Sequence, residues 1–178
     1  MTTYLVLLRG VNLGSQRTIS MPQLRLALAE LGFADVQTYI NSGDAILSSA
    51  KPADEVAAEV AGAIARIFGH RVDVVVRTAA ELAGVLAANP FPDGDPSQVT
   101  VAFLAATPGP QAGDRLAAAA AAEEPYVLAG REVYVNYTRG IGTSKLAATF
   151  SAAVGVSATV RNLRTVTKLD ELCGGRPR

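Results

Sequence analysis

Hydrophobic and polar residues follow one another in blocks that predict short strands separated by helices. Residues 4–8 form a continuous apolar run, which is typical of a central strand buried on both faces. Ser20 fits a helix N-cap, and apolar residues then recur on one helical face until Gly32 ends the helix. Two β-rich runs at residues 36–40 and 45–48, separated by a polar turn, predict a hairpin.

A second helix and a fourth strand complete the first part of the chain. The apolar periodicity predicts the helix over residues 52–68 and the strand over residues 72–77. The element order is therefore β-α-β-β-α-β, which is the order of a ferredoxin-like plait, a four-stranded antiparallel sheet with both helices on one face. Residues 1–78 are predicted to form the first ferredoxin-like subdomain.

The second part of the chain, residues 79–178, repeats this element order. It begins with a linking helix capped by Thr78, and a turn-rich stretch at residues 91–96 follows. The pattern then predicts strands at 99–104, 126–128, 132–136 and 158–161, helices at 111–122 and 143–154, and a last helix capped by Thr165. There is no letter-for-letter repeat, so the predicted duplication depends on element order. The fold class predicted is α+β, with two ferredoxin-like plaits in tandem.

The composition favours a folded globular chain and excludes several kinds of chemistry. Of the 178 residues 49% are hydrophobic, and 16 basic residues balance 16 acidic ones, which argues against a polyanion binder held by bulk charge. The single histidine, His70, and the single cysteine, Cys173, cannot build a multi-histidine or cysteine-rich metal site or an internal disulfide. We therefore expect no metal and no cofactor.

Targeting and membrane signals are weak in this sequence. The N-terminal residues lack a basic region, the apolar run 4–8 is short for a signal peptide, and no stretch approaches the length of a membrane span. A lone cysteine near the C-terminus fits a reducing compartment. These features predict a cytoplasmic protein that does not bind membranes, as a monomer or a homodimer.

The first candidate binding site is the loop of residues 9–19. Its 11 residues exceed the two to six usual for such a connection, which calls for a reason. Glycines allow close approach of a ligand, while guanidinium and amide groups donate hydrogen bonds to phosphate or carboxylate. The residues predicted to line this site are Arg9, Gly10, Asn12, Gly14 and Arg17. The alternative is a loop that packs its apolar residues on the core, with Arg9 in an ion pair.

A second candidate loop, residues 137–145, also leads from a strand into a helix. Thr143 and Ser144 are expected to expose backbone N–H groups at the helix start, while Arg139 and Lys145 supply positive charge. The alternative is a helix cap beside a solvated lysine.

A third candidate is Arg161, where the last strand meets the last helix. It lies in a basic region, since residues 139–178 carry seven basic and two acidic side chains. A solvated basic tail is the alternative explanation of that surplus.

Several motifs together resemble a known family. They are Leu7-Leu8-Arg9-Gly10-Val11-Asn12-Leu13-Gly14, Met21-Pro22-Gln23-Leu24 with Leu31-Gly32-Phe33, Thr38-Tyr39-Ile40-Asn41-Ser42-Gly43-Asp44, Ser144-Lys145-Leu146, and Arg161-Asn162 through Thr165. This set resembles the bacterial domain-of-unknown-function family numbered 1697. The resemblance implies two ferredoxin-like plaits and no established activity, cofactor or substrate.

The chain departs from the family pattern at three places. Asp44 stands where the pattern usually has Asn, Ser15 where it has Gly, and Leu163-Arg164 where it has Trp-Asn. The last difference removes an aromatic ring that could stack on a base, which weakens a nucleic-acid role.

Three hypotheses of function follow from the sequence. The favoured one is a binding module for a phosphate-bearing or other anionic small molecule. One alternative is an enzyme that acts on such a molecule through Arg and Lys electrostatics, and another is an interaction or scaffold protein that uses an exposed sheet edge. Specific nucleic-acid binding is expected to be absent or weak, because few phosphates could be neutralised.

Overall fold

The computed structural model describes residues 1–174, which group by contacts into two units. Unit 1 contains Met1–Gly84 together with residues 169–174, and unit 2 contains Val85–Lys168. The divisions fall inside two helices, α3 (Ala79–Ala87) and α6 (Leu163–Gly174). Residues 79–84 and 169–174, which the sequence pattern assigned to the second domain, thus group with unit 1. This grouping depends on tertiary contacts, and a linear pattern does not contain it.

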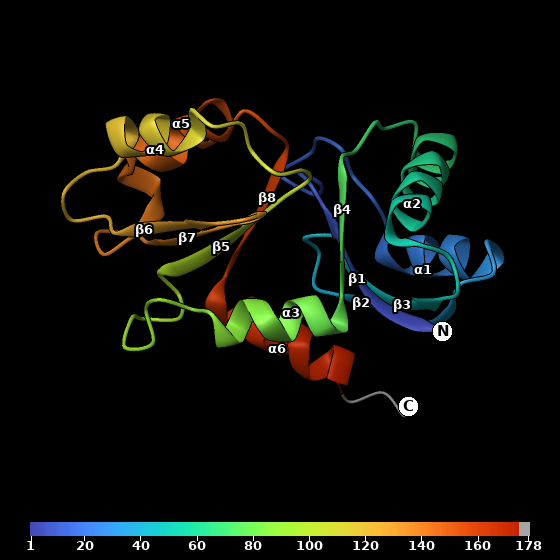
Figure 1. Ribbon diagram of the computed structural model, residues 1–178. Coiled ribbons are helices and arrows are strands. Elements are labelled where there is room, and N and C mark those ends of the chain that lie inside the picture. The colour runs from blue at the N-terminus through green and yellow to red at the C-terminus, as the bar shows by residue number, and fades with distance from the viewer. Residues whose placement is uncertain (175–178) are drawn as a thin grey trace. The chain divides into compact units, whose positions relative to one another are not determined.

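Unit 1 has one four-stranded antiparallel sheet (Figure 1). The strands lie in the order β2-β3-β1-β4. Their bounds are Thr2–Leu8 for β1, Ala34–Tyr39 for β2, Asp44–Ser49 for β3 and Val74–Thr78 for β4. Helices α1 (Met21–Glu30) and α2 (Ala53–Phe68) complete the predicted order β-α-β-β-α-β, which is confirmed in unit 1.

The core of unit 1 follows from the alternation of side chains along β1. Tyr4, Val6 and Leu8 pack in one cluster with residues of α1 and α2. Leu5 and Leu7 point to the opposite face and are fully buried as well, so the predicted central strand buried on both faces is confirmed. From α1 and α2 the cluster takes Leu24, Leu28, Val56, Val60 and Ile64.

Unit 2 contains a second four-stranded antiparallel sheet, in the order β6-β7-β5-β8. The strands are β5 (Val99–Leu104), β6 (Tyr126–Ala129), β7 (Glu132–Asn136) and β8 (Ala158–Asn162). Helices α4 (Ala112–Ala119) and α5 (Lys145–Val154) lie over one face of this sheet, where they share a core with it (Figure 1). The strands of the second half therefore form a sheet of their own, as predicted.

Two predicted helix starts are corrected by the structure. Residues Ile141–Thr143 form a short 3-10 helix, η1, so α5 begins at Lys145 rather than at Thr143. Helix α6 begins at Leu163, because the Asn162 Oδ1 atom already accepts a hydrogen bond from the Thr165 backbone N–H at 2.9 Å. Thr165 is thus the donor in the cap, and Asn162 is the capping residue.

Candidate functional site

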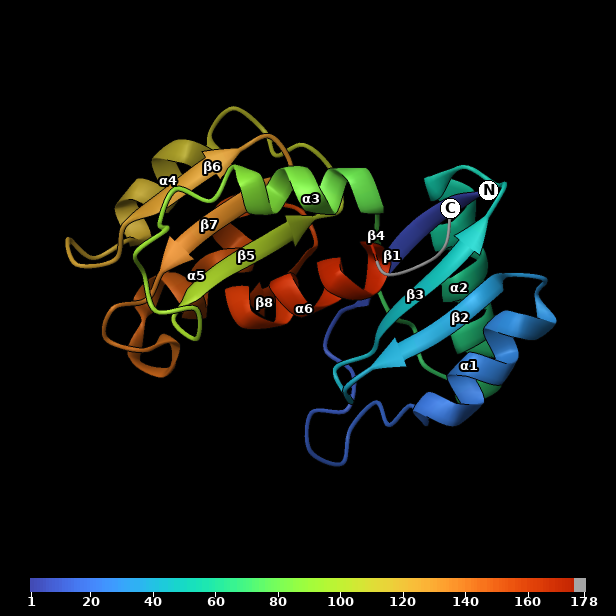
Figure 2. The same cartoon turned by 90° about the horizontal axis from the view of Figure 1, so that it is seen from below.

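The β1–α1 loop, which we define as residues 9–20, is held by the side chain of Asn12. The Asn12 Nδ2 atom donates to the Ile19 carbonyl at 3.0 Å and to the Asn41 carbonyl at 2.8 Å, and its Oδ1 atom accepts from the Ile19 N–H at 2.7 Å. Asn41 belongs to the turn between β2 and β3, which lies beside this loop in Figure 2. Asn12 therefore joins the two ends of the loop and ties both to the turn.

Gly43 gives the turn a second attachment to the loop. A Cβ atom at this position would lie 2.6 Å from Cγ2 of Val11 and 2.9 Å from Cβ of Leu8. Gly43 also has φ +86°, a left-handed conformation that side chains disfavour. Only glycine fits here, and its missing side chain allows the turn to pack directly against the start of the loop.

Backbone strain gathers where the loop and the turn meet. Among the described residues four that are not glycine have positive φ, and three of them lie here: Asn12 at 54°, Arg17 at 48° and Ile40 at 48°. Asparagine tolerates this region, but for a β-branched residue such as Ile40 it is a true outlier. Strained residues of this kind cost roughly 1–3 kcal/mol each and cluster at binding and active sites. The loop and the turn are therefore our candidate functional site.

Arg9 is engaged inside the protein. Its Nη1 atom lies 3.3 Å from Oδ2 of Asp73, and its backbone N–H donates to the Asp73 carbonyl at 3.1 Å. The two side chains are 40% and 57% exposed, so the ion pair contributes little to stability. The ion pair that the sequence analysis kept as an alternative thus exists.

Arg17 is the cation that the loop leaves available. Within residues 1–174 its guanidinium makes no hydrogen bond or ion pair. The Arg17 Nη1 atom would lie 3.6 Å from a Cβ atom at Gly10, so the guanidinium lies close above that glycine. Gly14 has nothing within 4 Å of its Cβ position and lies at the open end of the loop.

Ser144 in the second predicted loop is a capping residue rather than an exposed donor. Its Oγ atom accepts from the Ala147 N–H at 3.0 Å, and its own N–H donates to the Ile141 carbonyl at 3.2 Å. The 3-10 turn thus uses the amide that was expected to face an anion. Arg139 and Lys145 are exposed and make no ion pair with any described residue.

Arg161 lies in β8, where it is half-buried and aligned with Val101 of β5. Its Nη1 atom donates to the Val160 carbonyl at 2.9 Å. The predicted site residues are therefore grouped as follows: Arg9, Gly10, Asn12, Gly14 and Arg17 share the β1–α1 loop in unit 1, whereas Arg139, Ser144, Lys145 and Arg161 belong to unit 2. Asn41 and Gly43 were not predicted as partners of the loop. Their turn composition was the available signal, but it did not show what the turn touches.

Two buried tyrosines in unit 2 have strongly shifted pKa values. Burial raises the pKa of Tyr137 to about 12, and the nearby Glu124 carboxylate adds to the rise. Burial likewise raises the pKa of Tyr134 to about 12, with Glu132 as the second cause. The Tyr134 hydroxyl also donates to the Val85 carbonyl at 2.7 Å. Both phenols therefore keep their protons in the folded protein at a pH that ionises them in the unfolded chain.

We expect the free energy of unfolding to fall as the pH rises from about 10 to about 12. A phenol whose pKa is higher in the folded state binds its proton more tightly there, so loss of protons in this window favours unfolding. Urea midpoints at about pH 8 and about pH 11 check this, and Tyr137→Phe should reduce the drop. Equal midpoints at the two pH values would contradict the prediction.

Residues 1–174 contain neither a helix that could cross a membrane nor a cluster of metal-binding side chains. In residues 1–174 no helix combines the length and the apolar character needed to cross a membrane. In the same range no group of three or more His, Cys, Asp and Glu side chains is placed to hold a metal ion.

Comparison with known proteins finds a matching family and a similar structure. The sequence profile of a family described as "Protein of unknown function (DUF1697)" matches residues 1–134, a range that includes both segments. The conserved bacterial protein SP0830 from Streptococcus pneumoniae has a similar structure, with a TM-score of 0.77 and 20% sequence identity over 97% of this chain and 98% of that one. No curated protein matches the chain. The matched residues span most of the sequence, and the chain therefore belongs to the family of proteins of unknown function DUF1697.

Proposed function

We propose that the protein is a binding module for a phosphate-bearing or other anionic small molecule, and that the β1–α1 loop holds this ligand. The observation that carries the proposal is the guanidinium of Arg17, which lies above Gly10 without a partner in residues 1–174. A guanidinium pairs bidentately with phosphate or carboxylate oxygens, and a glycine beneath it lets those oxygens approach the backbone.

The rigidity of the loop supports this proposal. Asn12 and Gly43 hold the loop from two sides, so Arg17 is presented from a fixed backbone position. A ligand then binds with a smaller entropy cost than it would on a mobile loop. Arg17 and Ile40 also have a strained backbone. Strain of this kind is typical of sites where the backbone holds side chains in position for a ligand.

The second basic loop adds a weaker contact of the same kind. Arg139 and Lys145 are exposed and make no ion pair in the described chain. Within residues 1–174 neither side chain is held by a hydrogen-bond network such as the one around Asn12. We therefore assign to them a separate, weaker anion contact in unit 2, and to Ser144 and Arg161 a structural role.

We also infer that each unit is a ferredoxin-like plait and that the two arose by duplication. The strand orders β2-β3-β1-β4 and β6-β7-β5-β8 support this, because they are the same order counted from the start of each unit. So does a shared detail at the end of the fourth strands. Arg77 and Arg161 each donate from Nη1 to the preceding carbonyl, at 3.0 and 2.9 Å, and the residue after each, Thr78 or Asn162, caps the following helix.

Arg17→Gln is expected to weaken phosphate binding at least tenfold. Loss of a charge-assisted pair costs about 1.5–3 kcal/mol, and 1.4 kcal/mol corresponds to a factor of ten. A thermal-shift screen of pyrophosphate, sugar phosphates and nucleotides finds the ligand, because any molecule that binds only the native state raises the unfolding temperature. Titration calorimetry then gives the dissociation constants of the wild type and the variant.

Arg66→Gln is the matched control, since Arg66 is also an exposed arginine of unit 1 without an ion pair in residues 1–174. It should leave phosphate affinity unchanged. Equal affinity of Arg17→Gln and wild type would overturn the assignment to this loop. Short single-stranded DNA and RNA in the same screen test the expected absence of specific nucleic-acid binding, and turnover of a bound compound would favour the enzyme alternative.

A further inference from the structure

Unit 1 has a hollow of about 550 Å³ on its surface, open to solvent, which we call the cavity. It has no residue in common with the β1–α1 loop. Its volume is within the range of small-molecule sites. Six of the residues that line it are Glu30 and Leu31 at the end of α1, Lys51 before α2, and Glu59, Gly62 and Arg66 on α2.

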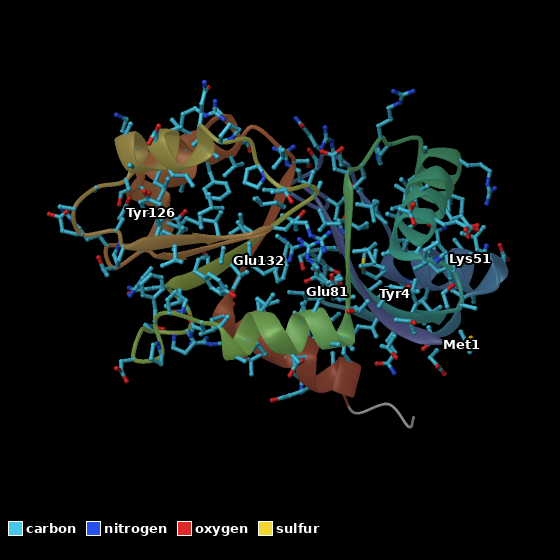
Figure 3. All side chains as sticks on the ribbon, in the orientation of Figure 1. Met1, Tyr4, Lys51, Glu81, Tyr126 and Glu132 are labelled. Carbon is cyan, nitrogen blue, oxygen red and sulfur yellow. The ribbon has the colours of Figure 1, made fainter. Side chains whose placement is uncertain are left out.

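Lys51 is fixed in position on one side of this cavity. Its carbonyl accepts from the Tyr4 hydroxyl at 2.9 Å, and its backbone N–H donates to the Ser49 hydroxyl at 3.1 Å. Figure 3 labels Lys51 and Tyr4 within unit 1. The Lys51 Nζ atom lies 2.5 Å from Oε1 of Glu59 and 5.9 Å from the centroid of the Phe33 ring. The ammonium group therefore holds one oxygen of the Glu59 carboxylate in place.

The other oxygen of Glu59 has no partner among residues 1–174. This oxygen, Oε2, is buried and receives no hydrogen bond within that range. A buried carboxylate oxygen without a donor is destabilising, and native structures contain few such atoms. Glu59 lines the cavity and its side chain is 29% exposed, so a turn of the carboxylate toward the cavity would bring Oε2 to a position where a ligand with an N–H group supplies the missing donor.

Gly62 is not explained by packing. It lies in the middle of α2, where glycine destabilises a helix relative to alanine. A Cβ atom there would meet nothing within 4 Å, and the residue does not have positive φ. Neither a close approach nor a turn thus requires glycine at this position. Its absent side chain does leave space in the cavity that it lines.

The charges at the cavity are balanced in sign. Lys51 is occupied by Glu59, and it also lies 3.8 Å from Glu55. Glu30 and Arg66 make no hydrogen bond or ion pair through their side chains in residues 1–174. The groups left for a ligand are therefore the Glu59 Oε2 atom, the Glu30 carboxylate and the Arg66 guanidinium.

We propose that this cavity binds a small zwitterion of the free amino-acid class. The Glu59 carboxylate turns toward the cavity, where Oε2 accepts a hydrogen bond from the ligand's ammonium group beside the negative charge of Glu30. The ligand's carboxylate pairs with Arg66. The side chain of the ligand occupies the space beside Gly62. Both charged groups of the ligand are thereby matched without changing the net charge of the site.

The test is a titration of the full chain with each free amino acid at millimolar concentration, followed by the amide NMR signals of α2. At least one amino acid should saturate these signals. Its N-acetyl derivative, which lacks the ammonium group, and its amide, which lacks the carboxylate, should each bind at least tenfold more weakly. If no amino acid saturates the signals, or if either derivative binds as tightly as the free amino acid, the proposal is wrong.

Two variants locate the binding. Gly62→Leu fills the cavity from an exposed helix position. Arg66→Gln removes an exposed cation that has no ion pair in the described chain. Each variant should stay folded and bind the amino acid at least tenfold more weakly. Arg71→Gln removes an exposed cation outside the cavity lining and should leave amino-acid affinity unchanged. Wild-type affinity in Gly62→Leu and Arg66→Gln, or an equal loss in Arg71→Gln, would overturn the proposal without affecting the phosphate proposal.

Discussion

Replacing Gly43 with alanine should lower the free energy of unfolding by about 3 kcal/mol or more. Its φ of +86° costs roughly 1–2 kcal/mol for a residue with a side chain. The added methyl would also lie 2.6 Å from Val11 and 2.9 Å from Leu8, and overpacking of this kind typically costs about 1–3 kcal/mol. Urea denaturation of wild type and variant measures the difference.

Gly32→Ala separates the two causes. Gly32 has almost the same backbone conformation, φ +85°, but nothing lies within 4 Å of its Cβ position. Gly32→Ala should therefore lower the free energy of unfolding only by the conformational cost of the positive φ, about 1–2 kcal/mol. If Gly32→Ala and Gly43→Ala destabilise the protein equally, the turn does not pack on the loop as tightly as described.

Replacing Asn12 with alanine should lower the free energy of unfolding by about 2–3 kcal/mol. The change removes three hydrogen bonds and leaves the Ile19 N–H and the Ile19 and Asn41 carbonyls without them. Alanine also tolerates the φ of 54° less well than asparagine. The measurement is again urea denaturation, with phosphate titration of the same variant to follow the loop.

Asn41→Ala is the control for this prediction. Asn41 meets Asn12 only through its backbone carbonyl, and its exposed side chain makes no hydrogen bond in the described residues. We therefore expect a change within about 0.5 kcal/mol. Asn12→Asp should destabilise the protein at least as much as Asn12→Ala, because it places an anionic oxygen against the Ile19 and Asn41 carbonyls in place of the Nδ2 donor. A loss in Asn12→Ala as small as in Asn41→Ala would mean that the side chain does not hold the loop.

The candidate site illustrates how far a local pattern reaches. The loop at residues 9–19 is longer than its connection requires, which favoured a binding site there. The composition of residues 41–44 predicted a turn. Neither signal predicted that Asn12 binds the carbonyl of Asn41, 29 residues away. That contact exists because β3 pairs with β1, which brings the turn beside the loop.

Arg9 shows the same limit. From the sequence Arg9 was predicted to bind a ligand, with an ion pair as the alternative. Its partner is Asp73, 64 residues further along the chain. The two meet because β4 runs antiparallel to β1 and pairs Leu8 with Val74. A sequence shows that an acid is available somewhere, but only the strand order selects which one.

By itself the sequence determined the helices and strands and their order, because apolar periodicity, caps and turn residues act within a few residues of each other. It also predicted that residues 4–8 are buried on both faces, since an unbroken apolar run leaves no polar side for water. Tertiary structure alone decided which helix turns group with unit 1, why Gly43 must be glycine, and how Glu30 at the end of α1 comes to line one cavity with Glu59 and Arg66 of α2. Those outcomes depend on contacts between segments far apart in the chain, and such contacts form only when the sheets and helices pack together.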